Sequence, residues 1–137
     1  MHNEGEIRLG RLYLDKARIE EMDRRISHLF LVEKPYLRAN YTLDRLAQDI
    51  HVSLHHLSAF VNHYYDMNFK DFINKTRIRY CISKITREEL KYKKIEAIAR
   101  EYGFSNRNTF RLAFKRSTGM TPSQYLKQKK ASDAGRT

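Results

Sequence analysis

An internal repeat constrains the fold of this 137-residue chain more than any other feature. The segment 43–73 matches the segment 95–126 at an offset of 52 residues, which becomes 53 after a one-residue insertion in the turn. The matched positions are apolar or small: Leu43 with Ile95, Leu46 with Ile98, Ala47 with Ala99, Leu57 with Phe110, Val61 with Phe114, and Met67 with Met120. A constant offset across several elements indicates two copies of one helical unit. With only two copies, the repeat predicts a duplicated domain and not a solenoid.

Each copy has residues that begin and end helices at the positions expected of a helix-turn-helix. In the second copy, apolar residues recur at helical spacing before Gly103, and glycine readily adopts the left-handed conformation of a helix C-terminus. Ser105 or Asn106 can cap the next helix, which would bury Phe110 and Phe114. Because the turn is short, the second helix must leave at a steep angle. A pair of helices in this arrangement is the unit that places its second helix in a DNA major groove.

The motifs of the two copies also resemble a known family. The second copy carries I-x-x-I-A-x-x-x-G-F-S-x-x-x-x-F, then F-K and G-M-T-P-S-x-Y, within residues 95–125. The first copy ends in the run FINKTRIR at residues 72–79. Over about residues 41–128 these motifs resemble the DNA-binding domain of AraC/XylS-type transcription regulators. The resemblance implies an all-α fold of two helix-turn-helix units joined by a long linker helix, which read successive major-groove segments on one face of the DNA.

The resemblance further implies a transcription regulator whose sensing or dimerising region usually lies elsewhere in the polypeptide. Double-stranded DNA is the expected partner, and RNA polymerase is a further expected partner. The residues themselves provide no glycine-rich phosphate loop and no nucleophile beside a base, so neither an enzyme nor a cofactor is expected. Cys81 is the single cysteine, which excludes an intramolecular disulfide and suits the cytoplasm.

Capping residues, glycines and prolines predict how the chain is organised, and no alternating pattern of strands persists. The chain should consist of an N-terminal segment 1–40 with an amphipathic helix, a DNA-binding domain 41–128 and a disordered tail 129–137. Within the DNA-binding domain we expect a first helix-turn-helix 42–65, a linker helix at about 71–88, a second helix-turn-helix 95–117 and a C-terminal helix 122–128. The N-terminal helix should begin after Asp15 and carry one apolar stripe: Ile19, Met22, Ile26, Leu29 and Phe30. This stripe fits either core packing or a dimer seam, and its shortness favours the core.

The positive charge of the chain is concentrated in the duplicated region. Residues 1–40 carry 8 Lys or Arg and 7 Asp or Glu, whereas residues 41–137 carry 19 and 9. The net charge of +11 therefore belongs almost entirely to the two repeats, as a polyanionic partner would require. Anionic membranes attract the same charge, but no segment approaches the length of a transmembrane span and no basic amphipathic helix with an exposed aromatic face stands out.

Helical spacing divides each second helix into a core side and an outward side that would face DNA. The candidates for contact with bases are His55, Ser58, Ala59, Arg107, Asn108, Arg111 and Leu112. The candidates for contact with phosphates are Ser53, Asn62, Lys94, Ser105, Thr109, Lys115 and Arg116. Cations, amides and hydroxyls are the groups that proteins use for both tasks.

One departure from the family keeps a second function open. The central outward position of each recognition helix commonly holds arginine in the family, but here these positions hold Ala59 and Leu112. Arg111, one residue away, can compensate in the second copy. An apolar side chain at the centre fits the methyl group of thymine. The alternative is a helical protein-interaction module that keeps the fold without reading sequence, and the retained charge favours DNA over it.

A histidine cluster raises the question of a metal site. His51, His55, His56 and His63 lie close in sequence, but His51 falls in the turn and no cysteine or carboxylate completes a ligand set. We therefore expect no metal, and we expect surface or DNA-facing histidines instead.

Overall fold

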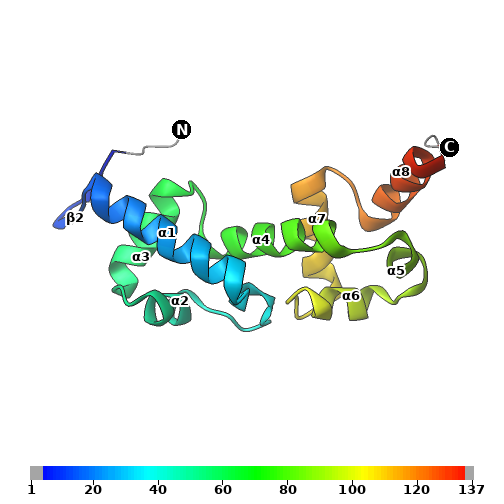
Figure 1. The fold of residues 1–137 in the computed structure, drawn as a ribbon, viewed down its shortest axis with the longest axis horizontal. Coiled ribbons are helices and arrows are strands. Elements are labelled where there is room, and N and C mark those ends of the chain that lie inside the picture. The colour runs from blue at the N-terminus through cyan, green and yellow to red at the C-terminus, as the bar shows by residue number, and fades with distance from the viewer. Residues whose placement is uncertain (1–4, 135–137) are drawn as a thin grey trace. The chain divides into compact units, whose positions relative to one another are not determined.

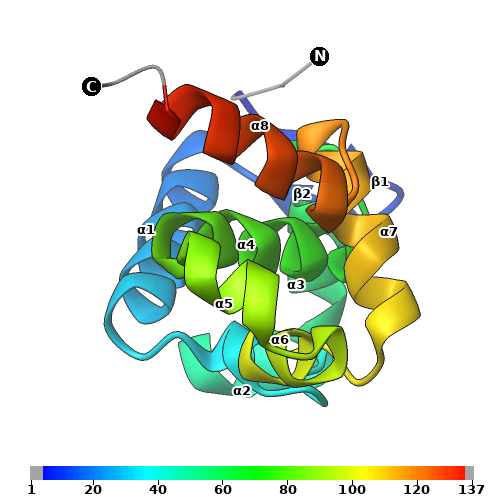
Figure 2. The same cartoon turned by 90° about the vertical axis from the view of Figure 1, so that its right-hand side faces the viewer.

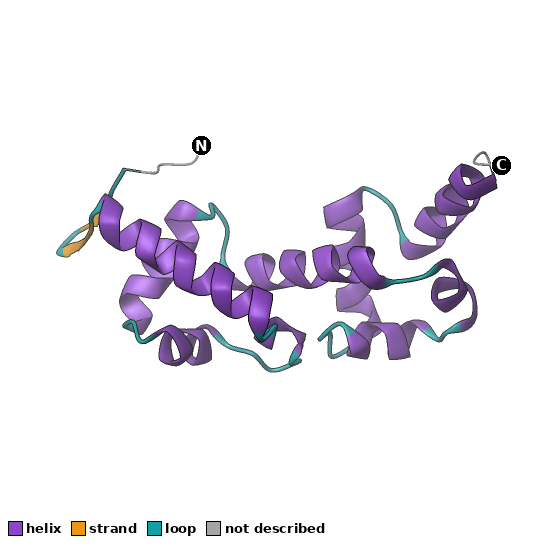
Figure 3. Ribbon diagram, in the orientation of Figure 1, coloured by secondary structure: helices purple, strands orange, loops and turns teal. Residues whose placement is uncertain are grey.

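The computed structural model describes residues 5–134 (Figure 1), which form helices throughout apart from one short hairpin near the N-terminus (Figure 3). The chain divides into two compact units. The first holds the residues up to Tyr36 together with Tyr41–Ile73, and the second holds Leu37–Asn40 together with the residues from Asn74 onward. Each unit contains one helix-turn-helix. The expected all-α class, with two such units, a linker helix and a preceding N-terminal helix, is confirmed.

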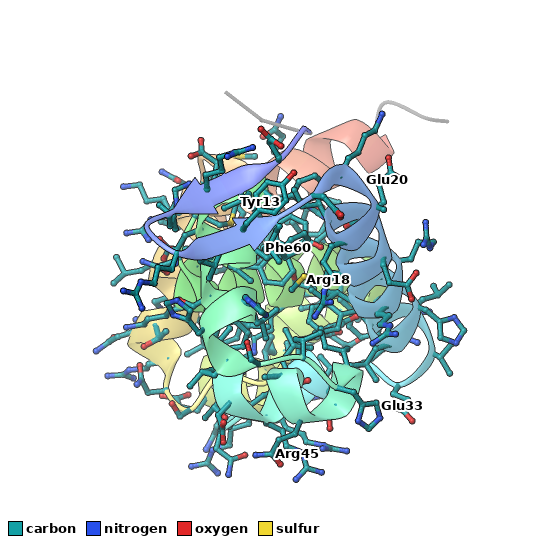
Figure 4. The ribbon with its side chains drawn as sticks, turned by 90° about the vertical axis from the view of Figure 1, so that its left-hand side faces the viewer. Tyr13, Arg18, Glu20, Glu33, Arg45 and Phe60 are labelled. Carbon is teal, nitrogen blue, oxygen red and sulfur yellow. The ribbon has the colours of Figure 1, made fainter. Side chains whose placement is uncertain are left out.

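The first unit begins with a β-hairpin that the sequence did not predict. Strands β1 (Ile7–Leu9) and β2 (Leu12–Leu14) pair antiparallel, with Arg8 opposite Tyr13. The hairpin buries one apolar side, formed by Ile7, Leu12 and Leu14, and exposes the other. Strands of three residues are too short to show a clear alternation, so periodicity alone does not reveal them. Strand β1 packs against the second helix of the unit, and Figure 4 shows the hairpin lying over that helix, with Tyr13 on the outside and Phe60 beneath.

Helix α1 (Lys16–Val32) follows, capped by the side chain of Asp15, which accepts a hydrogen bond from the Arg18 backbone N–H at 2.8 Å. Its apolar stripe is buried in the first unit, at Ile19, Met22, Ile26 and Phe30, while Leu29 is half-buried. Two polar contacts tie α1 to the same unit. The Tyr65 hydroxyl donates to Asp23 at 2.8 Å, and Arg25 donates to the Ile50 carbonyl at 2.8 Å. The apolar stripe of α1 therefore packs into the core of the first unit, as expected from its short length.

The first helix-turn-helix consists of α2 (Leu43–Ile50) and α3 (Leu54–Tyr64), preceded by a short 3-10 helix at Pro35–Leu37. The side chain of Thr42 caps α2, and that of Ser53 caps α3 by accepting from the His56 backbone N–H at 3.1 Å. His51 ends α2 in the left-handed conformation, with φ of 59°. Glycine is the usual residue at such a position, and here a histidine tolerates it.

Helix α4 (Phe69–Lys84) begins in the first unit and ends in the second. It stops four residues before the expected end of the linker, because Thr86 begins another helix, α5 (Arg87–Tyr92). Thr86 and Glu89 form a reciprocal capping box, in which the Thr86 hydroxyl accepts from the Glu89 N–H at 3.1 Å and the Glu89 carboxylate accepts from the Thr86 N–H at 3.4 Å. The sequence pattern did not predict α5, although residues 86–89 carry the Thr-x-x-Glu spacing of this capping box.

The remaining helices of the second unit are α6 (Ile95–Glu101), α7 (Arg107–Thr118) and α8 (Pro122–Ala134). Helix α5 lies between α8 and α6 in Figure 2, and contacts both. The core of the unit comprises Ile78, Cys81, Ile85, Ile98, Ala99, Tyr102, Phe104, Phe110 and Phe114. Helix α8 continues six residues past the expected end at 128, so the first part of the predicted disordered tail 129–137 is helical. Residues 135–137 lie outside the described part of the chain.

Helix α4 carries two side chains, Arg77 and Cys81, that are buried in the second unit. Arg77 donates to the Arg38 carbonyl at 2.8 Å and to the Asn74 side chain at 3.0 Å, and its guanidinium lies 5.5 Å from the ring centre of Phe104. Burial lowers the pKa of Arg77 to about 10. Burial likewise raises the pKa of the Cys81 thiol to about 12, so this side chain is protonated at neutral pH and acts as a small core residue.

Candidate nucleic-acid interface

Helix α7 is held firmly on the core of the second unit. Phe110 and Phe114 are fully buried, and Asn106 caps the helix by accepting a hydrogen bond from the Thr109 N–H at 2.8 Å. Of the two capping candidates from the sequence, the structure uses Asn106 and leaves Ser105 exposed in the turn. Gly119 ends the helix in the left-handed conformation, with φ of 79°. The outward side of α7 is therefore fixed in direction by these caps and this core.

That outward side is strongly basic. Four cations and no carboxylate lie on the helix, and its exposed side chains include Arg107, Asn108, Arg111, Leu112, Lys115 and Arg116. Thr109 is half-buried beside them. These are the residues that the sequence assigned to bases or phosphates, and the structure brings all of them together on one exposed surface of one helix. We call this set the α7 surface.

Arg107 has a protein partner on the neighbouring helix α6. Its guanidinium lies 2.8 Å from the Glu96 carboxylate at the start of α6. A backbone hydrogen bond within Glu96 and the neighbouring guanidinium together lower the pKa of Glu96. Both partners are about half-exposed, and exposed ion pairs of this kind contribute little net stability. Breaking this ion pair therefore costs little if Arg107 contacts another partner.

Arg111 lies on the flank of α7 that faces α6 and α8. It lines a hollow of about 420 Å³, whose wall also includes Lys93, Ile95 and the start of α8 at Pro122. Its charge also lowers the pKa of Glu96. Lys93, which also lines this hollow, is paired with Glu101 at 2.6 Å, and this hydrogen bond raises the pKa of Lys93. Arg111 is therefore set to one side of the helix, while Leu112 occupies the centre of the exposed side.

Helix α3 presents a different surface, without any Lys, Arg, Asp or Glu. Of its expected contact residues, His55 and Asn62 are exposed and Ser58 is half-buried. The Asn62 side chain donates to the Ser58 carbonyl at 2.8 Å, which turns it back onto its own helix. Ser53 is exposed and caps the helix. The α3 residues named from the sequence are thus on the surface, with one exception.

The exception is Ala59, which the sequence placed at the centre of the outward side and which the structure buries, with 6% of its surface exposed. The expectation that it faces a groove floor is wrong. A helical wheel assumes that one side of a helix is covered, but α3 packs against strand β1 as well as against α2. An alanine side chain reaches only one carbon from the backbone, so longer neighbouring side chains can enclose it. Ala59 is therefore not a candidate for contact with bases.

A basic run at residues 91–94, with three lysines beside Tyr92, precedes the second helix-turn-helix, and its lysines lie in different environments. Lys94 is exposed at the N-terminal boundary of α6 and stays a candidate for phosphate contact. Lys91 lies 5.2 Å from the ring centre of Tyr92, a tyrosine that is itself exposed. Lys93 is occupied by Glu101. Only part of the run is thus available to a partner.

Other kinds of site find no support in the part of the chain that the structure describes. Among the side chains that the structure describes, no group of three or more histidine, cysteine or acidic residues is placed to hold a metal ion. Nor does any helix described there have the length and apolar character to cross a membrane.

Comparison with known proteins agrees with this architecture. The sequence model of a helix-turn-helix domain family matches residues 46–128. The C-terminal domain of AraT, a response regulator from Geobacillus stearothermophilus, has a TM-score of 0.59 and 24% identity, over 79% of this chain and 84% of that one. An AraC-type regulator from Chromobacterium violaceum has a TM-score of 0.58 and 20% identity, over 80% and 91%.

The DNA-binding domain of AdpA, a global transcriptional factor whose structure was solved in complex with a target DNA, has a TM-score of 0.62 and 13% identity, over 82% of this chain and 95% of that one. These likenesses are likenesses of fold. No curated protein sequence matches the chain significantly. Because the family model covers more than half of the chain, including α3, α4 and the whole second helix-turn-helix, the chain belongs to the AraC-type helix-turn-helix domain family.

Proposed function

We propose that this chain binds double-stranded DNA sequence-specifically, as the DNA-binding domain of a transcription regulator. The observation that carries the proposal is the α7 surface. It brings four cations, an amide and a hydroxyl together, with no carboxylate, on the second helix of a helix-turn-helix. That helix is the one that helix-turn-helix proteins place in the major groove. The complex of the AdpA domain with a target DNA shows that a similar fold binds DNA.

The roles of individual residues follow from their chemistry. Arginine pairs with guanine and asparagine with adenine through two hydrogen bonds each, so we assign base reading to Arg111 and Asn108. Lysine is a point charge that suits a phosphate, so Lys115 takes a positioning role together with Arg116 and Thr109. Arg107 is assigned to bases because it lies in the first turn of α7, and it must first leave Glu96.

One specific observation supports a second function, that of a protein-interaction module. Leu112 is exposed at the centre of the α7 surface, where 67% of its surface is open to solvent. An exposed leucine is a contact point for a protein partner, although single exposed leucines are common. Under this alternative the fold serves as a protein-interaction module.

A salt titration separates the two functions. The full chain is mixed with a labelled random-sequence duplex, and the dissociation constant is measured by gel shift at two salt concentrations. If about six cations contact phosphate, affinity should fall roughly a thousandfold between about 50 and 200 mM salt. An interaction module predicts weak binding with little dependence on salt. Selection of sites from a random pool then tests sequence preference, and a pool that stays random after several rounds would refute sequence-specific reading.

A further inference from the structure

The two recognition helices carry positive charge in different ways. Helix α7 has four lysines or arginines. Helix α3 has none, and instead carries three histidines, His55, His56 and His63. A fourth, His51, lies in the turn just before α3. The α7 surface is thus cationic at every physiological pH, whereas the charge on α3 depends on the protonation of imidazoles, since histidine is the side chain that ordinarily changes charge between pH 5 and 8.

The histidines are placed to meet a partner. His51, His55 and His63 are exposed and His56 is half-buried. The rings of His55 and His56 lie 6.4 Å apart. His55 is in the first turn of α3, the end that a helix-turn-helix directs at base edges and nearby phosphates. With Asn62 turned back onto Ser58, imidazoles are the main polar groups that this surface offers.

The elements packed against α3 carry charged side chains of both signs. On α2, Arg45 pairs with Asp49 at 3.3 Å, and Asp49 also accepts a hydrogen bond from the Tyr41 hydroxyl at 2.9 Å. Asp44 on the same helix accepts a hydrogen bond from the Gln48 side chain at 2.9 Å. On the hairpin, Arg8 pairs with Glu6 at 3.2 Å, and Asp66 lies beyond the end of α3. Together α2 and the hairpin carry three cations, Arg8, Arg11 and Arg45, and three carboxylates, Glu6, Asp44 and Asp49, so they fix neither sign on the α3 surface. The protonation of the histidines therefore sets it.

We propose that α3 binds DNA through protonated histidines, chiefly His55 and His63, so that the first unit adds to DNA affinity as the pH falls. This inference rests on the proposed function and names the condition under which the first unit takes part in it. A phosphate close to an imidazole favours the protonated form, and binding then takes up protons from solution. At higher pH the permanently charged α7 surface supplies most of the electrostatic attraction.

The test is DNA affinity as a function of pH at fixed salt, with the full chain and a labelled random-sequence duplex of about 30 base pairs, long enough for both units. Each unit of pKa by which binding favours the protonated imidazole contributes tenfold, so the parent should bind about tenfold or more tightly at pH 5.5 than at pH 8. The double variant His55→Gln, His63→Gln should lose this rise. Both side chains are exposed, so the variant should fold, and a circular dichroism melt checks that it does.

Two further variants sharpen the result. His28→Gln removes an exposed histidine on α1 and is the matched control, which should keep the rise. His55→Lys supplies a fixed charge, so it should bind more tightly than the parent at pH 8 and depend less on pH. Calorimetry in two buffers of different ionisation enthalpy should detect proton uptake by the parent and less uptake by the double variant.

The outcomes distinguish this inference from the proposed function. A parent that fails to bind DNA at any pH contradicts the proposed function and removes the basis for this one. A parent that binds DNA with equal affinity at both pH values contradicts the inference alone. The inference is equally refuted if the double variant keeps the full rise, or if His28→Gln abolishes it.

Discussion

Ala59 and Leu112 occupy equivalent positions in the two copies of the repeat, yet 6% of the surface of Ala59 and 67% of that of Leu112 is exposed. The two helices also differ in their packing partners, since α3 packs against α2 and strand β1 whereas α7 packs against α6 and α8. The two recognition helices therefore have different surfaces as well as different charge. Only the second has an apolar side chain at the centre of its exposed side.

We predict that Leu112→Arg changes base preference. In the parent, an apolar side chain at the groove floor should favour thymine at one or two central positions through contact with its methyl group. An arginine there should favour guanine, by about 1–3 kcal/mol for a good bidentate contact. Site selection from a random pool, run in parallel with parent and variant, measures this. A parent that already prefers guanine at those positions, or an unchanged preference in the variant, would rule out the assignment.

The matched change in the first copy should affect folding instead of recognition. Ala59→Arg forces a long charged side chain into an enclosed position on α3, which must either displace its neighbours or bury a charge. We expect destabilisation of about 1–3 kcal/mol, as for overpacking in general. Thermal unfolding followed by circular dichroism tests this. An unchanged melting temperature, together with a gain of guanine preference, would show that Ala59 faces the groove after all.

Three alanine variants on α7 separate reading from positioning. Arg111→Ala and Asn108→Ala should relax base preference at one position each, with a loss of about 1–3 kcal/mol on the selected site. Lys115→Ala should weaken selected and random duplexes about equally and reduce the salt slope by about one contact. Dissociation constants on both duplexes at two salt concentrations provide the comparison. Equal losses on both duplexes for all three variants would show that the roles are assigned wrongly.

The repeat also predicts the geometry of the bound site. Two helix-turn-helix units that read one face of a straight duplex should contact major-groove segments about 34 Å apart, one helical turn or about 10 base pairs. A hydroxyl-radical footprint on a selected site should then show two protected segments on the same face at that spacing. A single protected segment would mean that one unit binds alone.

Alkaline unfolding should report on the contact between Tyr65 and Asp23. Burial, followed by the hydrogen bond to Asp23, raises the pKa of Tyr65 well above its ordinary value. Because the folded-state pKa exceeds the unfolded one, the stabilisation is complete below about pH 10 and is lost as the pH rises further. The free energy of unfolding should therefore fall above about pH 10 more steeply in the parent than in Tyr65→Phe.

Tyr92→Phe is the control for this experiment, because the Tyr92 side chain is exposed on α5. Its unfolding free energy should follow the parent across the alkaline range. If Tyr65→Phe falls as steeply as the parent, the phenol is not held neutral by the fold.

The sequence by itself determined the duplicated helix-turn-helix architecture, the caps and the α7 surface. The signals there are local: Thr42, Ser53 and Asn106 satisfy backbone groups within one turn, and the period of the apolar residues fixes which side of α7 is buried. The family motif lies in the same segments. Every contact residue named on α7 consequently appears on its surface.

Only the tertiary structure decided the surface of α3. Helix α3 packs against a hairpin about fifty residues earlier in the chain, and strands of three residues carry too little periodicity to reveal that contact. The same holds for Arg77, whose burial in α4 depends on the carbonyl of Arg38 in a distant loop. A helical wheel shows which side of a helix is apolar and therefore packs on its nearest partner. It does not show a second packing partner, because that contact joins segments that are far apart in sequence.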